Sequence, residues 1–177
     1  MKVTFRRTGA RRYAVIVESV GRAQQSVHPA PGYDDDIPHD LVHYVVEAEL
    51  ALSSGVFGRA ASGGGSFIAA QEGSARDRAR QQRKQRRREQ ALRVEDEGDR
   101  SDMATSERLA ALSDVAFRRR HGQKADPLRA PPIAPTPADE PRVDRVVARL
   151  TSLAPRWRAL PVGGELAFLW PSLEPLG

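Results

Sequence analysis

Cysteine is absent from this sequence, so disulfide bonds, thiolate nucleophiles and sulfur-ligated zinc are excluded. Long apolar runs are absent as well, and no stretch approaches the roughly 18 apolar residues that a membrane-spanning helix needs. The N-terminal residues carry charges but lack the apolar segment that a signal peptide contains. These absences together predict a soluble cytoplasmic protein with no membrane partner.

Lysine is rare, occurring only at Lys2, Lys84 and Lys124, whereas arginine is abundant. The 177-residue chain has a formal net charge of +5 and a pI of about 10.2. A chain that is rich in arginine and poor in lysine is typical of a GC-rich coding sequence. The basic pI by itself is therefore weak evidence for a nucleic-acid partner.

The strongest helix pattern in the chain runs from Ile37 to Ser53. Three aspartates precede Ile37, and Pro38 follows it, which suits the first turn of a helix and the positive end of its dipole. Gly55 is predicted to end the helix in the left-handed conformation. The apolar residues follow helical spacing at Leu41, Val42, Val45, Val46, Ala48 and Leu52.

On this helix His39, His43 and Glu47 are spaced four residues apart and form one stripe. The run His39 to His43 resembles the zinc-metalloprotease pattern H-E-x-x-H, with Asp40 in the place of the glutamate base. Two imidazoles one turn apart can hold a zinc ion, and Glu47 can supply a third ligand. The sequence thus offers a candidate metal site at His39, His43 and Glu47.

The alternative interpretation is structural. Asp40 is one methylene shorter than glutamate, which argues against the usual activation of a metal-bound water. The histidines would then be a half-exposed pair that bonds Asp36, Asp40 or Glu47 beside a core helix, and the protein would need no cofactor.

A second candidate site lies in the arginine-rich segment 76–93, which has nine basic and two acidic residues. Such a segment can follow a phosphate backbone without reading sequence. Two observations favour a solvated charged linker instead: the acidic run that follows it, and the lack of aromatic residues between Phe67 and Phe117. The residues predicted to contact nucleic acid are Arg83, Lys84, Arg86, Arg87 and Arg88.

The remaining patterns predict a single α+β domain with about three helices on one face of a small antiparallel sheet. Alternating apolar residues predict an N-terminal hairpin, a third strand near residues 23–28 and a final strand at Glu165–Trp170. A second helix is expected to be capped at Thr105–Ser106 and to stop at Gly122. The predicted parts are 1–58 (hairpin and main helix), 62–102 (glycine-rich, then charged insertion), 103–122 (second helix), 123–138 (proline-rich linker) and 139–177 (third helix and final strand).

Three segments resemble parts of small uncharacterised proteins from GC-rich actinobacteria. They are PHDLVHYVVEAELAL, GVFGRAASGG and LPVGGELAFLWP, which together cover about a fifth of the chain. The resemblance implies a bacterial, cytoplasmic source and points to no particular activity.

Two functions are consistent with these patterns. The first is a non-enzymatic interaction or regulatory module whose arginine-rich arm contacts nucleic acid or an acidic protein. The second is a metal-dependent hydrolase built on His39 and His43. We expect the first, because an enzyme usually shows polar residues converging from more than one element. The sequence leaves the oligomeric state open.

Overall fold

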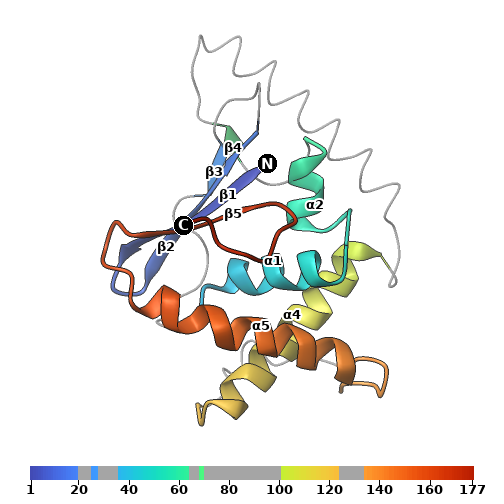
Figure 1. The fold of residues 1–177 in the computed structure, drawn as a ribbon. Helices are drawn as coiled ribbons and strands as arrows, with labels where there is room; N and C mark the ends of the chain where they lie inside the picture. The colour runs from blue at the N-terminus through green and yellow to red at the C-terminus, as the bar shows by residue number, and fades with distance from the viewer. Residues whose placement is uncertain (20–24, 28–35, 64–67, 70–100, 124–133) are drawn as a thin grey trace.

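The computed structural model describes residues 1–19, 25–27, 36–63, 68–69, 101–123 and 134–177 (Figure 1). The strands are β1 (Lys2–Gly9), β2 (Arg12–Glu18), β3 (Gln25–Val27), β4 (Ile68–Ala69) and β5 (Glu165–Leu169). The helices are α1 (His39–Glu49), α2 (Val56–Ala61), α4 (Asp102–Arg120) and α5 (Glu140–Arg158). The predicted α+β fold is confirmed.

The strands form one sheet in the order β4-β3-β2-β1-β5, with neighbours antiparallel. The N-terminal hairpin pairs β1 with β2, and the C-terminal β5 lies on the other side of β1. In that pairing Val3 lies opposite Phe168 and Phe5 lies opposite Leu166. The expectation that the first and last strands share a sheet is therefore confirmed.

The core lies between one face of the sheet and the helices, which gather on one side of it in Figure 1. Alternate strand residues point into this core, because successive side chains of a strand face opposite ways. Phe5 of β1 contacts Tyr44 of α1 and Phe57 of α2, while Tyr13 of β2 meets Trp157 of α5 edge-to-face. The strand residues of the core are Val3, Phe5, Tyr13, Val15, Val17, Leu166 and Phe168.

The predicted end of the main helix is wrong in its geometry. The helix α1 ends at Glu49, and the left-handed residue that follows is Ala51, with φ of 54°. Gly55 has φ of −73° and instead precedes the first residue of α2 as its N-cap. Gly55 is needed for space, because a Cβ built there would lie 2.3 Å from the carboxyl carbon of Glu47.

The predicted start of the second helix is also wrong. The helix α4 begins at Asp102, and Ser101 caps it by accepting a hydrogen bond from the Ala104 N–H at 3.0 Å. Ser106, which we expected near the cap, is fully buried inside the helix. The predicted stop at Gly122 is confirmed, because Gly122 has a left-handed φ of 68°.

The arginine-rich segment 76–93 and most of the proline-rich linker lie outside the described residues. The chain leaves the described structure after β4 and returns at the N-cap of α4. In the described part of the chain, no helix combines the length and apolarity required to span a bilayer.

Candidate functional site

Glu47 is the most buried charged side chain of α1, with no exposed surface. Its carboxylate accepts backbone hydrogen bonds from Val56 at 2.7 Å, Phe57 at 2.8 Å and Gly58 at 3.3 Å. These are the first three N–H groups of α2, which no residue within the helix can satisfy. Burial raises the pKa of Glu47, although these hydrogen bonds oppose the rise. The carboxylate therefore holds α2 against α1.

Ser106 links Glu47 to His43. Its hydroxyl donates to Glu47 Oε1 at 2.9 Å, and its Oγ lies 3.0 Å from His43 Nδ1. Because the single hydroxyl hydrogen goes to Glu47, the bond to His43 requires Nδ1–H as the donor. The lone pair of His43 is then on Nε2. Burial lowers the pKa of His43 to about 4, so the ring is neutral at pH 7.

The Nε2 atom of His43 faces two further groups. His39 Nε2 lies 3.2 Å away, and the two rings meet edge-to-face with their centres 4.7 Å apart. Glu107 of α4 places Oε2 3.7 Å from the same nitrogen. Two helices that are far apart in sequence thus bring two imidazoles and a carboxylate together.

Asp40 points elsewhere. Its carboxylate accepts a hydrogen bond from the Tyr13 hydroxyl at 2.9 Å. The backbone N–H of Asp40 in turn donates to the hydroxyl oxygen of Tyr13 at 3.3 Å. Burial raises the pKa of Asp40 to about 6; the Tyr13 hydrogen bond opposes this rise and the charge of Glu107 adds to it. Asp40 therefore connects the start of α1 to β2.

The structure brings His39 and His43 together, as their spacing predicts, but it assigns Glu47 a different position. Glu47 reaches His43 only through Ser106, and its hydrogen bonds go to the backbone of α2 and that hydroxyl. Among the described residues, no three His, Asp or Glu side chains are placed so that they could hold a metal ion. The predicted ligand set of His39, His43 and Glu47 is therefore not assembled.

Sequence reasoning missed Ser106 and Glu107. Ser106 lies three residues before Leu109 and so falls on the predicted apolar stripe of its helix. A polar residue on such a stripe is a usable signal of a buried hydrogen bond. Glu107 carries no comparable signal, because its approach to His43 depends on how α4 packs against α1.

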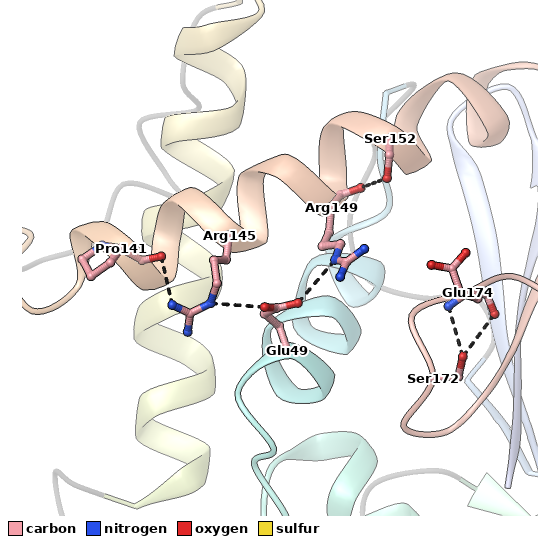
Figure 2. A network of polar contacts seen from close by, with 7 residues as sticks. All are labelled: Glu49, Pro141, Arg145, Arg149, Ser152, Ser172 and Glu174. Atoms are coloured by element: carbon pink, nitrogen blue, oxygen red, sulfur yellow. Dashed lines mark hydrogen bonds and ion pairs between the residues drawn. The ribbon is translucent and has the colours of Figure 1, made fainter.

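The predicted nucleic-acid contacts at Arg83, Lys84, Arg86, Arg87 and Arg88 lie outside the described residues. The folded body has its own arginines, several of which pair with carboxylates. Figure 2 shows Arg145 and Arg149 of α5 reaching Glu49 of α1 from the two sides, at 3.2 and 3.4 Å. Arg108 forms a bidentate ion pair with Asp139, in which its two terminal guanidinium nitrogens donate to the two carboxylate oxygens at 2.8 and 2.6 Å.

Comparison of the chain with known protein families, curated proteins and solved structures found no match. A function is therefore inferred from the residues of this chain and their contacts.

Proposed function

We propose that this protein is a non-enzymatic interaction module whose arginine-rich segment 76–93 binds nucleic acid through its phosphates. The main support for this proposal is the charge of that segment. Its eighteen positions contain nine basic residues and only two acidic ones. Contacts of this kind are sequence-independent and weaken as salt is added, because binding releases counterions from the nucleic acid.

The charge balance of the folded body supports this assignment. The described residues contain fifteen Lys and Arg against thirteen Asp and Glu, a net charge of only +2. Pairs such as Arg118 with Asp114 and Arg108 with Asp139 use part of that positive charge internally. The body is therefore close to neutral, whereas segment 76–93, with nine basic and two acidic residues, has a net charge of +7.

The contacts of Asp40 and of the predicted metal ligand Glu47 favour an interaction module over a metal-dependent hydrolase. Asp40, the counterpart of the catalytic glutamate in H-E-x-x-H, accepts its hydrogen bond from Tyr13. Glu47 is engaged by α2. Neither carboxylate is placed to activate a water molecule for hydrolysis.

Retention of the full-length protein on immobilised duplex DNA and RNA at low salt tests the proposal. The test variant replaces Arg83, Arg86, Arg87 and Arg88 by Gln. The matched control replaces four exposed arginines of the body by Gln, namely Arg12, Arg119, Arg142 and Arg156, and so removes the same charge.

We expect the test variant to lose retention and the control to keep it, with both melting near the temperature of the unmodified protein. The slope of log affinity against log salt should shrink by about 0.9 for each phosphate that the variant no longer neutralises. Equal weakening in the two variants would mean that total charge, not the segment, governs binding. If the unmodified protein is not retained at low salt, the proposal is wrong, and an acidic protein becomes the partner to test.

A further inference from the structure

The two imidazoles of α1 converge at their Nε2 atoms. The Nε2 atoms of His39 and His43 are 3.2 Å apart, whereas the ring centres are 4.7 Å apart. The two nitrogens therefore incline toward each other. Two imidazole nitrogens held at about 2.0–2.1 Å from one tetrahedral ion are separated by roughly 3.3 Å. The observed separation fits two ligands of a single metal ion.

The internal contacts of His43 place its lone pair on Nε2, which accepts a hydrogen bond from His39 Nε2–H in this structure, so a metal ion would bind there by replacing that proton. Its Nδ1–H donates to Ser106, whose hydroxyl donates to the carboxylate of Glu47, so the Nε2 lone pair faces His39. Metal-binding histidines commonly donate their second ring N–H to a group that fixes the ring in this way. Glu47 would thus orient a ligand through Ser106 instead of serving as one.

A third ligand is within reach on α4. The Oε2 atom of Glu107 lies 3.7 Å from His43 Nε2, and the side chain is 62% exposed. A carboxylate oxygen and an imidazole nitrogen on one tetrahedral ion are separated by roughly 3.4 Å. No three such side chains among the described residues are already placed to hold an ion, so binding would require the exposed Glu107 side chain to move closer to the two imidazoles.

We propose that His39, His43 and Glu107 bind one divalent transition-metal ion, with water at the remaining position. Two imidazoles and a carboxylate suit zinc and its neighbours in the first transition row. The ion would join the first turns of α1 to the start of α4, the helix that directly follows the arginine-rich segment. This inference is independent of nucleic-acid binding, since it rests on contacts within the described residues.

Zinc binding by the full-length chain, produced without a histidine tag, tests the proposal by calorimetric titration and elemental analysis. The test variants are His39→Ala and Glu107→Gln. The matched controls are His121→Ala, which removes the exposed histidine that bonds Thr151, and Glu140→Gln, which removes an exposed carboxylate at the start of α5. Circular dichroism checks that each variant is folded.

We expect one zinc ion per chain in the unmodified protein and in both controls. His39→Ala should abolish this binding. Glu107→Gln should weaken it at least as much as removal of an outer-shell partner does, about 10- to 100-fold. The proposal is overturned if the unmodified chain binds no more zinc than His39→Ala. It is also overturned if Glu107→Gln binds as tightly as Glu140→Gln, a result that does not depend on the histidines tolerating substitution.

Discussion

Two glutamates lie two residues apart on α1 and have different roles. Glu47 has no exposed surface, and its carboxylate is surrounded by three backbone N–H groups and the Ser106 hydroxyl. The Glu49 side chain is 15% exposed and pairs with Arg145 and Arg149, which are themselves half exposed (Figure 2). One carboxylate joins α1 to α2 and α4 inside the protein, and the other joins α1 to α5 at its surface.

The difference shows that the surroundings of a carboxylate decide how much it contributes. Removing an acceptor from buried N–H groups leaves them without either a protein partner or water, which costs about 1–3 kcal/mol for each group. Exposed ion pairs exchange protein contacts for water contacts and are worth about 0–1 kcal/mol. Equivalent substitutions at the two positions should therefore give unequal effects.

The largest expected effect is that of Glu47→Gln. The amide NH₂ of glutamine would face the backbone donors of α2 or the Ser106 hydroxyl, so at least one hydrogen bond is replaced by two donors facing each other. We expect a decrease of about 2–4 kcal/mol in the free energy of unfolding, measured with urea. Glu49→Gln is the matched control and should cost less than about 1 kcal/mol. Equal decreases would contradict the distinction between the two sites.

Gly55→Ala should have the next largest effect, because the added methyl group would clash with the same carboxylate. The added Cβ would lie 2.3 Å from the Glu47 carboxyl carbon, which cannot move without breaking its bonds to α2. We expect a decrease of about 1–3 kcal/mol in the free energy of thermal or urea unfolding. At Gly9 the nearest atom to an added Cβ is 3.6 Å away, so Gly9→Ala should cost less. If Gly55→Ala is harmless, Glu47 is not held as tightly as its contacts indicate.

Asp139 gives an intermediate case with a pH dependence. Burial raises its pKa, but hydrogen bonds from Thr136 and the pair with Arg108 outweigh this, and the net pKa lies below its usual value. A carboxyl whose folded pKa is lowered stabilises the protein above the unfolded pKa, near 3.9, and loses that contribution as pH falls through the folded pKa. Asp139→Asn should therefore destabilise the protein by about 1–2 kcal/mol at pH 7.

The destabilisation by Asp139→Asn should shrink as the pH drops below about 4, as followed by urea unfolding at each pH. Asp144, which pairs with Arg120 on the surface, provides the control. Asp144→Asn should change the free energy of unfolding little, both at pH 7 and below about pH 4. A gap between Asp139→Asn and the unmodified protein that stays constant down to about pH 2 would contradict the assigned shift.

The smallest effects are expected at the arginines in Figure 2. Arg145→Ala and Arg149→Ala should each change the unfolding free energy by about 0.5 kcal/mol or less, because each pair is half exposed and Glu49 keeps the other arginine. The double variant should show equally weak coupling, and added salt should reduce it further. A coupling energy as large as the effect of Glu47→Gln would mean that Glu49 contributes as much to stability as Glu47, which contradicts the distinction between them.

The sequence predicted those parts of the fold that depend on local periodicity. Alternation in β1, β2 and β5 and helical spacing in α1, α4 and α5 located each element, and the spacing of His39 and His43 placed them together. The role of Glu47 was not predictable in this way. Its partners lie nine to eleven residues ahead on α2 and, at Ser106, on another helix, so they depend on packing. The start of α4 was missed because Ser101 and Ser106 are equally good N-cap residues and the apolar spacing begins only at Leu109. The end of α1 was missed because alanine adopts the left-handed conformation far less readily than glycine.

The tautomer of His43 tests most directly whether Glu47 acts through Ser106 to orient the imidazole. Long-range ¹H–¹⁵N correlation spectra of metal-free, ¹⁵N-histidine-labelled protein distinguish the two ring nitrogens. We predict a proton on Nδ1 and none on Nε2 at pH 7, with the ring staying neutral as the pH falls toward 4. A proton on Nε2 and none on Nδ1 would contradict the chain of hydrogen bonds from Glu47 through Ser106 to His43. Titration near the ordinary value of 6.5 would contradict the burial that lowers the pKa of the ring.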